Sequence, residues 1–197
     1  MADIRAFHRR ALETCAEIVD QVSDSQLSLA TPCSQWSLRQ LLAHMSVQNN
    51  GFAVAASGEK SDLASWHPEE DSDDPVHEFR ASAEALLTAF ADDEVLTREF
   101  WLPELSPDRP FPAEQAIGFH FVDSIVHGWD VAASIGVPAS FDLDLVEAVR
   151  PFSLAVPGGD SRQRPGSVFA QEVTASSEST LDIVLAWLGR DPAWQPA

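Results

Sequence analysis

The stretch Gly118-Phe-His-Phe-Val-Asp-Ser-Ile-Val-His-Gly-Trp-Asp130 combines large apolar residues with ionisable side chains at helical spacing. Its apolar positions and the residue before it form one helix face: Ile117, Phe121, Ile125 and Trp129. Asp123 and His127 are four residues apart, so on a helix their side chains lie one turn apart on the same side. One divalent metal ion can accept a carboxylate oxygen and an imidazole nitrogen from such a pair. The stretch therefore predicts a helix over about residues 112–134 that supplies two metal ligands.

A metal site enclosed by protein needs a third ligand from another segment, and His44 is the best candidate. It lies on a second predicted helix, residues 37–58, on a side that packing should turn towards the interior. A buried ring nitrogen without a partner costs on the order of 1–3 kcal/mol. An ion shared with the facing helix would satisfy it, and bundle cores are a common place for such sites. We therefore predict His44, Asp123 and His127 as metal ligands.

His120 and Asp130 lie on the same stripe, three residues before Asp123 and three after His127. They are alternative ligands, or partners that support the ligands. Simpler interpretations also fit the spacing, because a lone histidine on an apolar face is more often a hydrogen-bonded core residue. An Asp–His pair at this spacing is likewise more often a surface ion pair. The remaining histidines are interpreted as non-ligands: His8, His67 and His77.

Helical periodicity along the rest of the chain predicts a bundle. The four main helices cover about residues 3–23, 37–58, 75–92 and 112–134, with N-cap candidates at Ser37 and Asp74. A shorter helix at 142–156, kinked or divided by Pro151, and a last helix at 177–189 follow. The connections are predicted as an exposed acidic loop at 59–74, an extended segment at 98–105, a loop at 157–167 and a short extended stretch at 168–175. We expect an all-α four-helix bundle in one domain over residues 1–197.

Composition excludes several classes of partner. The formal net charge is −19, and Lys60 is the only lysine, so the surface should repel nucleic-acid backbones and anionic membranes. No apolar run approaches the roughly 20 residues that cross a bilayer, and the N-terminus lacks the features of a signal peptide. We expect a cytoplasmic protein that binds neither nucleic acid nor membranes.

Two cysteines, Cys15 and Cys33, are too few for a disulfide framework, and neither belongs to a CxxC pair. Cys15 falls at helical spacing on the first predicted helix and is interpreted as a core residue. Cys33 follows Thr31-Pro32 in a predicted turn. We interpret it as structural rather than nucleophilic.

Three blocks of the sequence together resemble a known family. They are Thr31-Pro-Cys-Ser-Gln-Trp-Ser-Leu-Arg-Gln-Leu-Leu-Ala-His44, Asp123…His127-Gly-Trp-Asp-Val-Ala132, and Leu188-Gly-Arg-Asp-Pro-Ala-Trp194. The pattern is similar to the actinobacterial DinB-like metal-binding family that includes the N-terminal domain of mycothiol-dependent maleylpyruvate isomerase. The resemblance implies a DinB-like four-helix core, here with additional short C-terminal helices, that binds zinc through three side chains and leaves one position to water. Nickel is the alternative ion.

Residue by residue, the resemblance assigns ligand roles to His44 and His127. Asp123 stands where the isomerase has glutamate. This side chain is shorter by one methylene, so the third role either stays with Asp123 or passes to His120.

The resemblance also implies a function. Related bundles bind a low-molecular-weight thiol, here expected to be mycothiol, at the open metal position, and the metal lowers the pKa of the thiol. Our first hypothesis is a thiol S-transferase or thiol-dependent isomerase that acts on a small electrophile. A metal-dependent hydrolase and a non-enzymatic metal-binding module are the alternatives.

Two further expectations concern the outer parts of the chain. Arg162 or Arg164 in the 157–167 loop could meet a substrate carboxylate, although solvated loop arginines are the simpler interpretation. The chain is expected to be a monomer or a homodimer. The tryptophans near the C-terminus either contribute to a dimer interface or, in the interpretation we prefer, pack against the bundle.

Overall fold

A computed structural model of the protein describes residues 3–34, 36–68, 72–164, 167–175 and 177–196. Within these ranges the chain forms the helices α1 (Ile4–Val19), α2 (Leu38–Ala56), α3 (Pro75–Phe90), α4 (Ala113–Ile135), α5 (Leu143–Leu154) and α6 (Thr180–Trp187). A two-stranded antiparallel sheet joins β1 (Glu99–Phe100) to β2 (Phe111–Pro112). The predicted all-α class is confirmed. Parts of the predicted loops 59–74 and 157–167 lie outside the described residues, as does Gln35.

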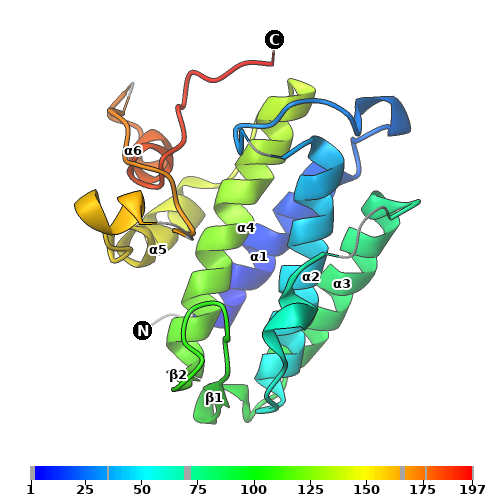
Figure 1. Ribbon diagram of the computed structural model, residues 1–197, viewed down its shortest axis with the longest axis vertical. Helices are drawn as coiled ribbons and strands as arrows, with labels where there is room; N and C mark the ends of the chain where they lie inside the picture. The colour runs from blue at the N-terminus through cyan, green and yellow to red at the C-terminus, as the bar shows by residue number, and fades with distance from the viewer. Residues whose placement is uncertain (1–2, 35, 69–71, 165–166, 176, 197) are drawn as a thin grey trace.

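Helices α1 to α4 form the bundle (Figure 1). Helix α4 runs in the same direction as α1, because His8 lies beside His120 and Cys15 packs against Gly128. Helix α2 runs in the opposite direction to α4. In that pair, His44 contacts His127 and, two turns further along α2, Phe52 contacts His120. The chain therefore brings the middle of α2 opposite the middle of α4.

Local chemistry sets the ends of the helices that matter for the site. At the start of α2, Ser37 and Gln40 form a capping box in which Ser37 N donates to Gln40 Oε1 at 3.0 Å. Asp74 caps α3 by accepting from the backbone N–H of His77 at 3.1 Å. Gly136 ends α4 in the left-handed region at a φ of 73°, which glycine adopts without strain. Both N-caps and this helix end agree with the sequence prediction.

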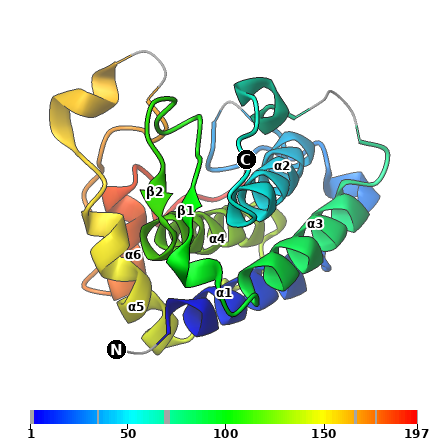
Figure 2. The same ribbon diagram turned by 90° about the horizontal axis from the view of Figure 1, so that it is seen from below.

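The last two helices pack against the outer face of α4 (Figure 2). They share a core that is separate from the main one and includes Phe121, Ile125 and Val149. Trp187 and Trp194 are partly buried against this core, so they pack on the bundle as preferred from sequence. Pro151 lies within α5, in its last turn, and the helix continues as one element rather than two. No helix in the described part of the chain is long and apolar enough to cross a membrane.

The acidic loop prediction at 59–74 was wrong in one respect. Residues Leu63–Trp66 form a short 3₁₀ helix, and Trp66 is buried rather than exposed. Its ring lies against Gly51 of α2, where any added Cβ would stand 2.8 Å from the ring, and its Nε1 donates to Ser61 Oγ at 2.8 Å. Trp66 belongs to a polar stretch of the sequence, but its ring is buried because Gly51 on α2 has no side chain and leaves room for it.

The later loops also differ from expectation. Arg162 lies in a 3₁₀ helix at Gly159–Gln163 and is buried, so it is neither a solvated loop residue nor free to meet a substrate. Its guanidinium donates to the carbonyls of Pro157, Ala170 and Trp187 and so caps the C-terminal end of α6. Arg164 is exposed. The 168–175 segment forms no strand, whereas the predicted extended connection at 98–105 contains β1.

Candidate metal centre

The structure brings the three predicted ligands together from two helices. His44 on α2 and Asp123 and His127 on α4 each offer one donor atom, and these atoms lie within 4.8 Å of one another. Nε2 of His127 is 3.3 Å from Oδ1 of Asp123. The rings of His44 and His127 meet nearly edge to face, with their centroids 5.2 Å apart. One side of α4 thus supplies a carboxylate and an imidazole to a point that the α2 imidazole also reaches.

The three side chains differ in their access to solvent. The side chain of His127 is 9% exposed, whereas that of Asp123 is 28% exposed. Trp36, just before α2, covers His44 with its ring centroid 4.5 Å away. The donors are therefore covered on the side of Trp36, whereas solvent reaches them on the side of Asp123.

The second nitrogen of His127 is held by Asp130, one turn further along α4. Its Nδ1–H donates to Oδ2 of Asp130 at 2.9 Å. In the neutral ring this contact fixes the tautomer in which Nε2 carries the lone pair, on the side of Asp123 and His44. A carboxylate behind a coordinating histidine orients the ring and raises its basicity. Asp130 therefore acts in this structure as a partner that supports a ligand, one of the two roles predicted for it.

Asp130 is itself held in place by the C-terminal segment. It is fully buried, and Arg190 donates to its two oxygens from Nε at 3.3 Å and from Nη2 at 3.0 Å. The Sγ–H of Cys33 donates to Oδ2 of Asp130 at 3.2 Å, and Nη2 of Arg190 also reaches Cys33 Sγ at 2.8 Å. Two distant segments of the chain thus meet behind His127.

The charges at the site suit a divalent cation. Burial and, after it, the neighbouring His127 together lower the pKa of His44 to about 4 against the opposing charge of Asp123, so the ring stays neutral at pH 7. Burial would raise the pKa of Asp123, but His127 and His44 hold it well below its usual range. Burial opposes the charged form of His127, yet Asp123 and Asp130 raise its pKa well above the ordinary value. A metal ion would take the place of the proton on Nε2 of His127, next to Asp123, and would leave the Nδ1 proton with Asp130.

Cys33, His127 and Asp130 form a second group whose donor atoms also lie within 4.8 Å. The guanidinium of Arg190 contacts both Cys33 and Asp130, so a fixed positive charge already neutralises this group. Among the described residues no arginine or lysine forms an ion pair with His44, Asp123 or His127, and the charge of Arg190 acts on His44 and Asp123 without direct contact. Electrostatics therefore favours the first group as the place for an ion.

His120 does not join either group of donors. Its Nδ1 lies 2.9 Å from Nε2 of His8 and 3.2 Å from Oγ of Ser124, and both histidines are buried. Nδ1 of His8 and Nε2 of His120 have no hydrogen-bond partner within the described structure. His8 is therefore a buried partner of His120, in keeping with its interpretation as a non-ligand.

Arg190 was not predicted to take part in the site, and Cys33 was predicted to be structural without any contact there. Both lie in the blocks that carry the family resemblance, which was the available signal. Their convergence on Asp130 depends on packing between segments 97 and 60 residues away in the sequence. No spacing rule reports such contacts.

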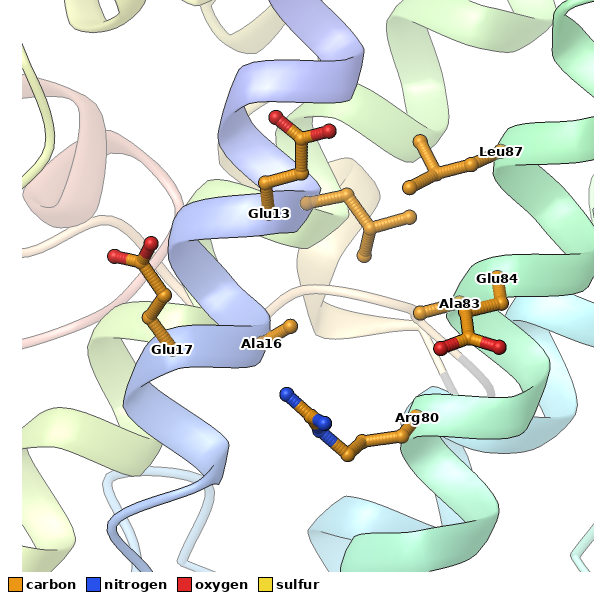
Figure 3. Close-up of a pocket in the computed structure, with 8 residues that line it drawn as sticks. Glu13, Ala16, Glu17, Arg80, Ala83, Glu84 and Leu87 are labelled. Carbon is orange, nitrogen blue, oxygen red and sulfur yellow. The ribbon is translucent and has the colours of Figure 1, made fainter.

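Two hollows of the surface lie away from these donors. A groove of about 240 Å³ runs between α1 and α3, where Figure 3 shows Glu13 and Glu17 on one side and Arg80 on the other. A second hollow of about 460 Å³ lies at the start of α1, with His8 among its lining residues. None of the three donors lines either hollow.

Comparison with known proteins places this geometry in a wider group. The family model described as the mycothiol maleylpyruvate isomerase N-terminal domain matches residues 8–132. Two Mycobacterium tuberculosis proteins, from strains CDC 1551/Oshkosh and H37Rv and both described as uncharacterized, are each 28% identical over 184 residues. The match covers 93% of this chain and 95% of theirs.

Two solved structures share the fold. A mutant of mycothiol-dependent maleylpyruvate isomerase gives a TM-score of 0.69 at 14% identity, over 95% of this chain and 88% of that one. Another crystal structure of mycothiol-dependent maleylpyruvate isomerase gives a TM-score of 0.56 at 16% identity, over 77% of this chain and 67% of that one. The fold therefore recurs in these proteins at low sequence identity.

Proposed function

The chain belongs to the mycothiol maleylpyruvate isomerase N-terminal domain family, and from this premise we propose that it uses a divalent metal ion to activate a small thiol. The proposed ligands are His44, Asp123 and His127, and the proposed ion is zinc, with nickel as the alternative. Two imidazoles and one carboxylate are a ligand set found in catalytic zinc sites. Such sites keep one position for a substrate or for water.

The observation that carries this proposal is the orientation of His127. Asp130 accepts from Nδ1, so Nε2 is directed to the space that His44 and Asp123 share. A histidine that merely filled the core would not need a buried carboxylate, itself held by Arg190, behind it. The arrangement matches the carboxylate–histidine pairs that accompany protein metal ligands.

The ion would supply one chemical effect, a lower pKa for a thiol at its open position. The chain's own residues do the rest of the work. Trp36 closes one side of the donors, and the partly exposed Asp123 marks the side from which a thiol can approach. Asp130 and Arg190 keep the ring of His127 from turning.

We propose mycothiol as the thiol and a small electrophile as the second substrate, in a thiol S-transfer or a thiol-dependent isomerisation. This choice follows the family, whose model and solved relatives are described by mycothiol and maleylpyruvate. In the transfer reaction, the sulfur would bond to the electrophilic carbon while a leaving group departs with its electron pair. The proton of the thiol would pass to a base of the protein.

The test is consumption of mycothiol in the presence of chlorodinitrobenzene, followed by the absorbance of the thioether product. We expect turnover with zinc-loaded protein and none above the uncatalysed rate with protein stripped by a chelator. His44→Ala should abolish turnover, whereas His77→Ala, an exposed histidine on α3, should leave it unchanged. Equal rates in loaded and stripped protein would refute metal-dependent thiol chemistry.

A further inference from the structure

The loop between β1 and β2 carries a carboxylate that is tied to the helix of His44. The loop lies beside α4 in both views of the molecule (Figures 1 and 2). Glu104 in this loop accepts a hydrogen bond on Oε2 from Nε2 of Gln48 at 2.7 Å. Gln48 follows His44 by four residues on α2, so the two side chains lie one turn apart on the same side of the helix. The hydrogen bond therefore holds Glu104 about one helical turn from a proposed metal ligand.

The bond is built from an anchored donor. Gln48 is 6% exposed, so its amide is held in place by the packing of α2. Glu104 is an exposed residue of the loop. Oε1 of Glu104 has no hydrogen bond to another described residue and remains free to accept one. A buried amide thus holds a carboxylate one helical turn from His44, where it also feels the charge of Asp123.

The environment of Glu104 also suits a proton acceptor. Partial burial raises the pKa of Glu104, and the charge of Asp123 acts in the same direction, while Gln48 and His67 oppose the rise. By contrast, the histidines hold the pKa of Asp123 low, and Arg190 and His127 hold that of Asp130 low, in spite of burial. A base whose pKa is closer to neutral accepts a proton from a thiol more effectively.

We propose that Glu104 is the base that takes the proton of a thiol entering the open side of the metal centre. This inference rests on the proposed function. The S–H bond would break, its proton would bond to Oε1 of Glu104, and the sulfur would keep the electron pair as a thiolate. Gln48 is a positioning residue in this step, because it acts only through its hydrogen bond to Glu104.

The test follows the binding of a simple thiol rather than turnover. Cobalt(II) replaces zinc, N-acetylcysteine is mixed with the loaded protein, and the sulfur-to-cobalt charge-transfer band is followed by stopped flow. General-base assistance contributes about 10²- to 10⁴-fold, so Glu104→Gln should slow the appearance of the band by about 10²-fold or more. The amide keeps an oxygen for Gln48, and cobalt binding should be unchanged.

Two further variants sharpen the result. Asp108→Asn removes a negative charge from an exposed position of the same loop and should leave the rate unchanged. Gln48→Met keeps the volume of the side chain but frees Glu104, so it should slow the band with no loss of cobalt. A melting temperature within a few degrees of wild type will show that each variant is folded.

The outcomes separate the two proposals. If wild-type protein binds cobalt but N-acetylcysteine and mycothiol both fail to produce the band, the proposed function is refuted, and the role of Glu104 with it. If the band forms at the same rate in Glu104→Gln and wild type, only the role of Glu104 is refuted. If the band appears as slowly in Asp108→Asn as in Glu104→Gln, the role of Glu104 is also refuted, because the negative charge of the loop alone would then explain the effect.

Discussion

Nδ1 of His127 lies 2.9 Å from Oδ2 of Asp130, and this contact decides which nitrogen of His127 is available to a metal ion. The carboxylate is completely buried and the ring nearly so, so neither can exchange its partner for water at low cost. The metal affinity of the site should therefore depend on a residue that is not itself a ligand.

Replacing Asp130 tests that dependence. Asp130→Asn keeps the shape of the side chain but removes the charge that orients and polarises His127, and loss of such a partner costs about 10- to 100-fold in metal affinity. We expect a drop of this size in zinc affinity, measured by competition with a chromophoric chelator. Asp142→Asn, at an exposed position before α5, is the control. Unchanged affinity in Asp130→Asn would show that the contact does not serve metal binding.

Arg190 should contribute chiefly to the stability of the fold. Its side chain is 8% exposed and pairs with the buried Asp130, so Arg190→Met would leave that carboxylate without a cation. Breaking a buried ion pair from one side costs about 3–5 kcal/mol. We expect a loss of this order in the free energy of unfolding of the metal-free protein in urea.

A second substitution shows whether the cost comes from the uncompensated charge. The double variant that carries both Arg190→Met and Asp130→Asn should recover part of the free energy of unfolding lost in Arg190→Met alone. Arg150→Met, at an exposed arginine of α5, should change the free energy by less than about 1 kcal/mol. If Arg190→Met lowered the free energy of unfolding as little as Arg150→Met, a stabilising role of the buried Arg190–Asp130 pair would be contradicted.

The buried pair of His8 and His120 predicts a pH dependence of stability. Burial lowers the pKa of His8 well below 6.5 and that of His120 to about 4. As the pH falls from about 6.5 towards 4, these two histidines therefore become protonated in the unfolded chain while they stay neutral in the folded chain. The stabilising contribution of the neutral rings is complete above pH 6.5 and is lost below it, by up to about 1.4 kcal/mol per pH unit for each ring.

Urea unfolding of metal-free protein at pH 7, 6 and 5 measures this effect. We expect the free energy of unfolding of His8→Leu to fall less than that of wild type between pH 7 and pH 5, because one of the two buried neutral histidines has been removed. His77→Gln, at an exposed position, should keep the wild-type slope. A steeper loss in His8→Leu than in wild type would contradict the assignment of a neutral His8.

Helices α2 and α4 were predictable because their signals are local. Ser37 caps the first and Gly136 ends the second, and the apolar periods between these points lie within single segments. The same spacing put Asp123 and His127 on one side of α4, and the structure brings His44 to them. Trp66 could not be placed this way, because its burial depends on the small size of Gly51 on another element.

The residues behind the ligands were harder to predict for a related reason. The alternatives left open for Asp130 and His120 depended on what faced each side chain. The residue that faces Asp130 is Arg190, 60 residues away in the sequence. The residue that faces His120 is His8, 112 residues away. Helical periodicity gives the face of a residue but not the partner that tertiary packing places there.

The most direct test of the central claim is the amount of metal bound per chain after purification under metal-replete conditions. Elemental analysis should find about one zinc or nickel ion per chain in wild type and in His77→Ala, and almost none in His44→Ala or His127→Ala. Asp123→Ala should also lose the ion, whereas His120→Ala should keep it. If wild type and the two ligand variants hold equally little metal, the site formed by His44, Asp123 and His127 is not a metal centre.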